Sequence, residues 1–258
     1  MSQLEDGISD VLYKAIRGLG KTISEVSQEA GIDEASIVHV IEVADDEEAL
    51  RKLAGVLNLE AAALLNLPNY KPDVAKVSGV KRLIMPFHAW SVNAWLLESN
   101  GFTLLFDTGW NRLDILSKLN GIQPDAVFIT HAHEDHVGGV DSLQEKGIKV
   151  ISETEALEIG EFKFGEIKIQ VLDLSGHCVP SASYLVTGFE RPFWVVGDAI
   201  FAGSMGGCKS TENFKMAVAS LRKGFDSVDA DSLILPGHGP VTSVGFERTS
   251  NPFCKYFS

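Results

Sequence analysis

The stretch THAHEDH, residues 130–136, places three histidines and an aspartate within six residues, directly after the apolar run AVFIT. Imidazole and carboxylate groups are ligands suited to zinc, iron or manganese. A chain that leaves a strand in extended form would direct residues 131 and 133 to one side. A turn at 134–136 can then present Asp135 and His136 to a second point nearby. The stretch therefore predicts a metal site that two ions could share.

Three further candidate ligands each stand at or just after the end of an apolar run, beside a glycine. They are His177 after QVLDL, Asp198 at the end of FWVVGD, and His238 after SLILP. Glycine lets the backbone bend so that a short side chain can turn back toward the strand ends, which is where α/β sheets place their sites. Taken singly, each residue fits a structural role better, as a buried histidine or an aspartate in a turn. Together with the first stretch they give five histidines and two aspartates.

The segment after residue 80 alternates short apolar runs with helical patterns. The runs end in Gly, Asp or Pro, and the helical patterns fall at about 111–120, 137–146 and 211–225. Alternating apolar residues on either side of Gly165-Glu166 predict a β-hairpin over 162–171. Strands mixed with helices over this length indicate an α/β or α+β domain.

The motifs in this segment resemble those of the metallo-β-lactamase-fold hydrolases. The matching motifs are HAHEDH at 131–136, GH at 176–177, GD at 197–198 and GHGP at 237–240. The upstream VNAWLLESNGFTLLFDTG is similar to the opening strand pair and Asp-Thr-Gly turn of that superfamily. The resemblance covers residues 80–254 and implies an αββα sandwich, with two sheets face to face, helices outside and metal ions at one edge.

The resemblance also implies a role for each ligand. The first metal ion would be bound by His131, His133 and His177, and the second by Asp135, His136 and His238. Asp198 would bridge the two ions. Asp107, in the Asp-Thr-Gly turn, would brace the ligand loops from behind, although a simple turn-forming role is an equal alternative.

A pair of divalent ions implies hydrolysis. Two cations a few ångströms apart lower the pKa of a bridging water, so that hydroxide is available near neutral pH and can attack a carbonyl. We expect a dinuclear metal-dependent hydrolase of a thioester, ester or lactone, with Asp135 and Asp198 as the catalytic carboxylates. Zinc is the first choice of metal, with iron or manganese as alternatives.

The resemblance is closest to the glyoxalase II branch, in the tail GHGPVTSVGFERTSNPF and in GDAIFAGSMGG before it. Two features depart from that branch. The chain stops at Ser258 without the helical tail that supplies much of the glutathione site, and residues 204–207 lack the arginine often found there. Both departures count against a glutathione thioester as substrate. Four residues on the loops expected to rim the metals suggest an aromatic wall for a small-molecule substrate, with core packing as the alternative: Phe87, His88, Trp90 and Trp110.

Two alternatives to the hydrolase stay open. The first is a non-haem iron oxidoreductase of the same fold that resembles the persulfide dioxygenases, with His131, His177 and Asp198 holding the iron. The second is a regulator that senses a metabolite in the metal pocket and acts through an N-terminal helix-turn-helix.

The N-terminal part reads as a separate helical domain, residues 1–68, joined by a linker at 69–79 to the catalytic domain at 80–258. Gly31 is expected in a turn between two short helices and Asp33 at the start of the second. Residues 8–67 resemble the lambda-repressor-like helix-turn-helix family. Residues 22–50, however, contain nine acids and no Lys or Arg. Because DNA readers need cations, we expect a protein-interaction, dimerisation or active-site-covering element, with homo-oligomers through this part, rather than a DNA-binding domain.

The composition limits the classes of protein and of partner that the sequence allows. The chain has 258 residues, of which 45% are apolar and 22% charged, a mix typical of globular proteins. Its net charge of −13 disfavours nucleic acid and anionic membranes as partners. Three scattered cysteines are interpreted as reduced thiols, and neither a signal peptide nor an apolar run long enough to span a bilayer is visible. These features predict a cytoplasmic protein.

Overall fold

The computed structural model describes residues 4–72 and 77–257. The predicted linker at 69–79 therefore lies partly outside the described residues, at 73–76. Within the described residues, no helix has both the length and the apolar character needed to cross a membrane.

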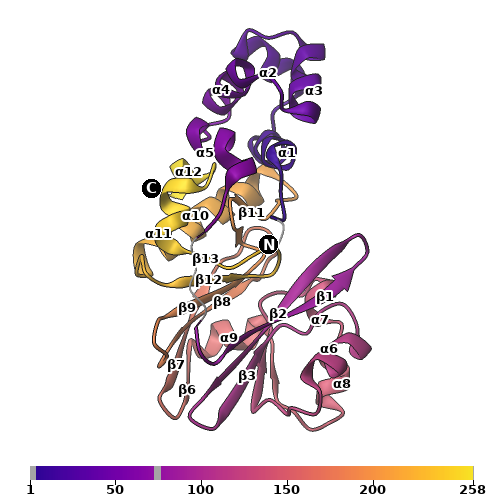
Figure 1. Ribbon diagram of the computed structural model, residues 1–258, viewed down its shortest axis with the longest axis vertical. Coiled ribbons are helices and arrows are strands. Elements are labelled where there is room, and N and C mark those ends of the chain that lie inside the picture. The colour runs from indigo at the N-terminus through magenta and orange to yellow at the C-terminus, as the bar shows by residue number, and fades with distance from the viewer. Residues whose placement is uncertain (1–3, 73–76, 258) are drawn as a thin grey trace.

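Two β-sheets form the lower part of the molecule in the view of Figure 1, below the N-terminal helices. The first sheet has five strands, in the order β1 (Val80–Phe87), β2 (Trp90–Ser99), β3 (Phe102–Phe106), β4 (Ala126–Phe128) and β5 (Val150–Ile151). Its first three strands are antiparallel, and β3, β4 and β5 are parallel. The second sheet has six, in the order β13 (Thr242–Ser243), β12 (Leu233–Pro236), β9 (Phe193–Gly197), β8 (Ala182–Thr187), β7 (Ile167–Asp173) and β6 (Glu161–Phe164). A small ribbon pairs β10 (Ile200–Phe201) with β11 (Ser204–Met205).

Three apolar clusters separate these layers. Phe106 and Phe128 of the first sheet meet Tyr184 of the second in the core between the sheets. A second cluster covers the outer face of the first sheet with α6 (Arg112–Leu119) and α8 (Val140–Gln144). The third covers the outer face of the second sheet with α10 (Thr211–Ser227), α11 (Val244–Ser250) and α12 (Cys254–Phe257). This arrangement of helix, sheet, sheet and helix confirms the αββα sandwich. It also confirms the hairpin at 162–171, which is β6 and β7.

The N-terminal residues are helical, as expected. They form α1 (Ile8–Leu19), α2 (Ile23–Ala30), α3 (Glu34–Val43), α4 (Glu47–Val56), α5 (Ala61–Asn66) and a 3-10 turn, η1 (Leu67–Asn69). Gly31 ends α2 in the left-handed conformation, and the Asp33 side chain caps α3 by accepting from the Ser36 amide. Both residues therefore act as the sequence predicts.

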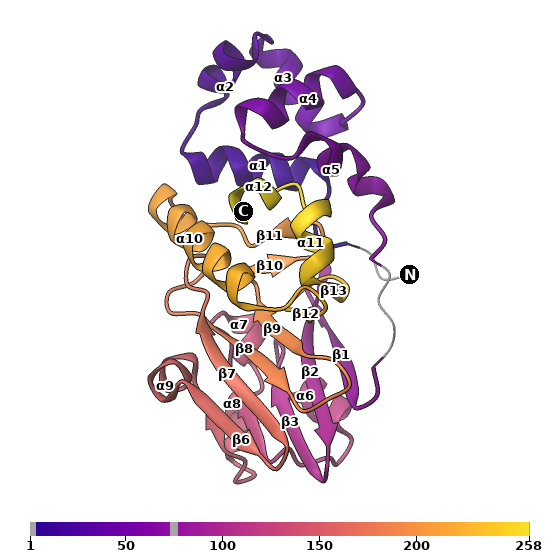
Figure 2. The same ribbon diagram turned by 90° about the vertical axis from the view of Figure 1, so that its left-hand side faces the viewer.

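These helices pack directly on the sandwich (Figure 2). The ring of Phe214 on α10 fills the space beside Gly18 of α1. The Tyr256 hydroxyl donates to the Leu57 carbonyl at 2.7 Å, and the Glu60 amide donates to the Pro252 carbonyl at 2.7 Å. Helices α1–α5 and the outer helices of the second sheet thus share one apolar cluster.

The ends of four strands converge at one edge of the sandwich. Strand β4 leads into residues 131–136 and the short α7 (Glu134–Val137), while β7, β9 and β12 lead to residues 177, 198 and 238. Sequence-distant segments meet here because each follows a strand that ends at the same edge.

Candidate metal centre

The structure brings all seven predicted ligands together in two adjacent groups. Within each group the potential ligand atoms lie within 4.8 Å of one another, and no exposed side chain belongs to either group. The first group holds His131, His133, His177 and Asp198; the second holds Asp135, His136 and His238.

The first group has the spacing that a tetrahedral ion requires. Nδ1 of His133 lies 3.1 Å from Nε2 of His131 and 3.1 Å from Nε2 of His177. Ligand atoms at the usual Zn–N distance would be about 3.3 Å apart in a tetrahedral site. Oδ2 of Asp198 completes the group, at 3.6 Å from Nε2 of His177 and 3.9 Å from Nε2 of His131.

Asp198 also reaches the second group, so its carboxylate lies between the two. Oδ2 of Asp198 is 3.4 Å from Nε2 of His238, and Oδ1 is 3.3 Å from Nε2 of His136. Asp135 approaches the same two histidines, with Oδ2 at 3.2 Å from Nε2 of His238 and 3.8 Å from Nε2 of His136. This is the position expected of a bridging ligand.

Hydrogen bonds behind the histidines orient their ligand nitrogens. Nδ1 of His136 donates to Asp107 at 2.8 Å, that of His177 to the Gly207 carbonyl at 2.6 Å, and that of His238 to the Ser91 carbonyl at 2.8 Å. In a neutral imidazole with a proton on Nδ1, Nε2 carries a lone pair. The acceptors on Nδ1 therefore orient each ring so that the Nε2 lone pair points into the centre, as in metal-binding histidines.

Two buried atoms support the fit to cations. Nε2 of His136 and Oδ1 of Asp198 make no hydrogen bond within the described part of the chain. A lone pair that faces a carboxylate oxygen at 3.3 Å is unfavourable unless a positive charge lies between them. The donor set of nitrogen and carboxylate oxygen atoms suits zinc, iron or manganese, so the residues present fit two divalent ions.

Electrostatics show that this centre attracts positive charge. Burial lowers the pKa of His131 and of His177 and keeps these imidazoles neutral. Burial also opposes charge on His136 and His238, but the carboxylates around them together outweigh it and raise the pKa of His136 to about 10 and that of His238 to about 11. These carboxylates are mainly Asp198 and Asp107 at His136, and Asp198 and Asp135 at His238. Burial alone would raise the pKa of Asp198, yet His238 and His136 together lower it well below its ordinary value. A bound divalent ion would take the place of the protons on these two histidines.

The glycines beside the ligands have a steric role. A Cβ atom at position 237 would lie 2.2 Å from Oδ1 of Asp198, and one at position 197 would lie 2.5 Å from Oγ1 of Thr130. Gly197 also has a positive φ of 51°. Only glycine lets the chain turn this closely behind Asp198 and His238.

Three of the four predicted aromatic residues pack against one another. The ring centroids of Phe87, His88 and Trp110 lie 4.7 to 5.3 Å apart. Trp90 is 58% exposed and stands next to Ser91, whose carbonyl accepts from His238. A role for these residues in substrate binding stays a prediction.

The N-terminal segment reaches the centre through Glu5 and Lys14, two residues that the sequence analysis did not single out. Oε2 of Glu5 lies 3.9 Å from Nδ1 of His238, and Nζ of Lys14 donates to the Met205 carbonyl at 3.0 Å. These residues are separated from their neighbours by about two hundred positions, and no motif links them.

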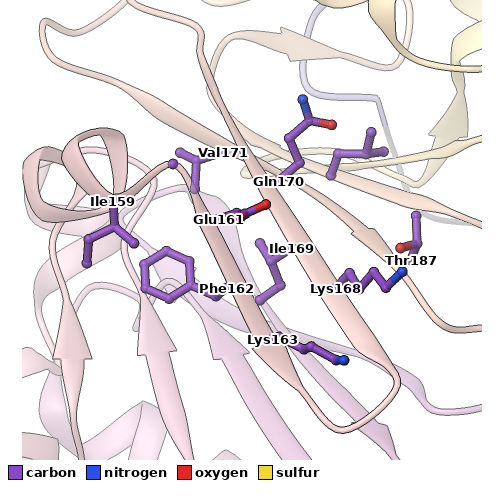
Figure 3. A pocket seen from close by; sticks show the side chains of 11 residues that line it. Ile159, Glu161, Phe162, Lys163, Lys168, Ile169, Gln170, Val171 and Thr187 are labelled. Atoms are coloured by element: carbon purple, nitrogen blue, oxygen red, sulfur yellow. The ribbon is translucent and has the colours of Figure 1, made fainter.

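One hollow formed by the described residues lies away from this centre. It measures about 860 Å³ over the β6–β7 hairpin, where Figure 3 shows Lys163 and Lys168 among its lining. It contains none of the seven ligand residues. Because it has no comparable set of convergent titratable groups, it is not the candidate active site.

Comparison with known proteins gives matches in the same region. Residues 89–207 match the family described as the metallo-beta-lactamase superfamily. The probable metallo-hydrolase YqgX of Bacillus subtilis (strain 168) is 28% identical over 207 residues, which cover 67% of this chain and 97% of that protein. The crystal structure of the B3 metallo-beta-lactamase BLEG-1 superposes with a TM-score of 0.55 at 22% identity, over 68% of this chain and 99% of that one. TTHA1623, solved in a di-iron-bound form, gives a TM-score of 0.51 at 26% identity, over 66% of this chain and 98% of its own.

Proposed function

We propose that this chain, which carries a metallo-β-lactamase-superfamily domain over residues 89–207, is a dinuclear metal-dependent hydrolase of a thioester, ester or lactone. The observation that carries the proposal is the position of Asp198, whose two oxygens face histidines of both ligand groups at 3.3 and 3.4 Å. The description of YqgX as a probable metallo-hydrolase supports it.

Each residue of the centre would have a defined role. His131, His133 and His177 would hold one ion, Asp135, His136 and His238 the other, and Asp198 would bridge them. When bound, the ions would supply hydroxide near neutral pH and polarise the carbonyl that is attacked. Asp107 would keep His136 oriented through its 2.8 Å hydrogen bond. The two carboxylates, Asp135 and Asp198, would balance the charge of the ions within a buried site.

An iron oxidoreductase similar to the persulfide dioxygenases is a second candidate. His131, His177 and Asp198 lie in one group, as that chemistry would need, and a similar protein has been solved in a di-iron-bound form. The complete second group favours the hydrolase. Oxygen consumption with a persulfide substrate would identify the oxidoreductase, and product release from an ester without oxygen uptake would identify the hydrolase.

Metal content is the first test. We expect close to two transition-metal ions per chain in protein purified without chelator. Asp198→Ala removes the carboxylate between the ions, and we expect ester or thioester hydrolysis to fall by more than about 100-fold, because losing even an outer partner of a ligand costs ~10–100-fold. Asp226→Ala, at an exposed position on α10, is the matched control. Folded wild-type protein with one ion or none after metal is added back would refute the dinuclear proposal.

A panel of thioesters, esters, lactones and phosphoesters is the second test. We expect modest activity at best on the glutathione thioester of lactate. Residues 204–207 offer no cation for the glutathione carboxylates, and Lys14, which contacts this loop, is paired with Asp6. If that thioester proves the best substrate, with a micromolar KM, this part of the proposal is wrong.

A further inference from the structure

The segment that precedes α1 lies against the loop that carries His238. A Cβ atom on Gly239 would be 3.3 Å from the Glu5 nitrogen and 3.5 Å from the Glu5 Cβ. The Glu5 carboxylate points toward the back of the His238 ring, with Oε2 at 3.9 Å from Nδ1, and its side chain is 21% exposed. A partly buried carboxylate therefore stands behind one ligand of the second group.

Helix α1 fixes this segment in place. Lys14 pairs with Asp6, whose side chain is only 8% exposed, and donates to the Met205 carbonyl at 3.0 Å. The Lys14 ammonium also lies 5.0 Å from the centre of the Phe201 ring, and Phe201 meets the edge of His238 with ring centroids 5.8 Å apart. Lys14 thus connects the segment to the chain that follows Asp198, so Glu5 is positioned by the fold and is not part of a free tail.

Among the ion pairs of the described residues, the Glu5 carboxylate approaches only His238. The nearby cation, Lys14, is taken by Asp6. Nδ1 of His238 already donates to the Ser91 carbonyl at 2.8 Å, so this N–H faces both a carbonyl and a carboxylate. Oxygen atoms behind a ligating imidazole hold its ring in orientation and make the opposite nitrogen a better donor to metal.

We propose that Glu5 is a positioning residue of the metal centre, which acts through His238 to strengthen the second metal site. The N-terminal helical part would then form the outer wall of that site. This inference rests on the proposed function, because it requires His238 to be a metal ligand. It assigns the N-terminal part a role at the active site that does not need a partner.

The test is metal affinity in the full-length protein. Zn²⁺ and Co²⁺ are titrated into chelator-treated wild type, Glu5→Gln and Glu5→Asp, by competition with a chromophoric chelator. We expect the affinity of the first site to be unchanged and that of the second to weaken by about 10-fold or more in Glu5→Gln, the usual cost of losing an outer partner. Glu5→Asp keeps the carboxyl group but places it further from His238. Its affinity for the second ion should therefore lie between those of wild type and Glu5→Gln. Glu42→Gln, on the exposed face of α3, should match wild type.

The Co²⁺ absorption spectrum gives a second readout that a purely structural role would not move. We expect only the bands of the second ion to change in Glu5→Gln. Equal weakening of both ions, or two unchanged affinities, would overturn the inference while leaving the hydrolase proposal intact. Wild-type protein that binds fewer than two ions would refute the proposed function and this inference with it. If Glu5→Gln does not fold, the affinities of Glu5→Asp decide.

Discussion

Asp107 connects the two ligand groups from behind. Its carboxylate accepts from the Thr130 amide at 2.8 Å, from the Thr130 hydroxyl at 2.9 Å and from Nδ1 of His136 at 2.8 Å. Because the Thr130 hydroxyl donates to Asp107, its oxygen is free to accept from Nδ1 of His131 at 3.0 Å. Asp107 itself has a positive φ of 60°, a conformation that Asp adopts at moderate cost. The contacts favour the bracing role over a simple turn-forming one.

We predict that Asp107→Asn weakens metal binding by about 10–100-fold. The asparagine amide keeps the size of the side chain, but its NH2 group would face N–H and O–H donors of Thr130 and His136 that donate to the carboxylate in the wild-type protein. Metal retained after dialysis against a chelator would measure the loss, with Asp226→Asn as the control. Unchanged retention in Asp107→Asn would show that Asp107 only shapes the turn.

Glu247 is a second buried carboxylate, which the sequence did not single out. It is fully buried and accepts from Thr242 at 2.6 Å, from Asn251 at 2.7 Å, from the Gly203 amide at 3.1 Å and from Tyr70. It joins the end of the N-terminal part to β13 and α11. Burial raises the pKa of Glu247 above its ordinary value, although these four hydrogen bonds oppose the shift.

The raised pKa gives a prediction about stability and pH. A carboxyl whose pKa is higher in the folded state contributes stability below its unfolded pKa and loses that contribution as pH rises through the folded pKa. Glu247→Gln keeps a similar shape, can donate to the hydroxyls of Thr242 or Tyr70, and does not titrate. We expect the difference in Tm between Glu247→Gln and wild type to shift in favour of the variant as pH rises from 5 to 8. Glu42→Gln should show no such trend, and a difference that stays constant with pH would contradict the prediction.

Among the elements, α1 and α10 pack closely at Gly18. A Cβ atom there would lie 2.4 Å from Cδ2 of Phe214, whereas one at Gly55, on the exposed face of α4, meets nothing within 4 Å. We predict that Gly18→Ala destabilises the protein by about 1–3 kcal/mol, because it forces the two helices apart. Gly55→Ala should stabilise it by about 0.5–1 kcal/mol through helix propensity. Urea unfolding of both variants would measure this, and equal effects at the two sites would contradict the packing shown here.

The elements also show what a sequence can reveal. Local rules were sufficient for the cap at Asp33, for the β6–β7 hairpin and for the strand ends that present His131, Asp198 and His238. These features depend on neighbours within a few residues. The pairing of β9 with β12, by contrast, joins segments about forty residues apart. No periodicity encodes that register, so the sequence analysis did not predict it.

The contact of Glu5 with His238 could not be predicted from the sequence either, because it joins segments far apart along the chain. It depends on how α1 packs against α10 and on the Lys14–Asp6 pair, and both contacts arise only after distant parts have folded together. Glu247 was missed because a lone glutamate in a helical tail ordinarily faces solvent. Its burial follows from the docking of Tyr70 beside it.

At the scale of the whole molecule, residues 4–68 do not stand apart from the sandwich. Leu12 and Ile16 of α1 belong to the same apolar cluster as Phe214 and Tyr256. Their division from the catalytic part as a domain of its own stays a prediction. The shared cluster implies that deletion of the N-terminal part would expose apolar surface on α10 and α12, so point substitutions are the better test of its role.

The charge of this N-terminal part leads to the last prediction, that the protein does not bind duplex DNA specifically. Residues 1–70 contain thirteen acids and five bases. On α3, the helix that would enter a groove, Glu34 and Glu42 are exposed, and Asp33 caps its start. Each phosphate contact needs a cation or a helix N-terminus, and carboxylates at this surface would repel the backbone.

A gel-shift experiment with a random duplex library at physiological ionic strength would check this, and we expect no retained fraction above the level of bovine serum albumin. Replacing Glu34 and Glu42 by lysine together should increase weak, salt-sensitive binding, because the change adds cations to the same face. That variant confirms that the assay can detect binding through α3. A sequence-selective shift by the wild-type protein, abolished by charge reversal at Lys21 and Arg51, would instead support the regulator.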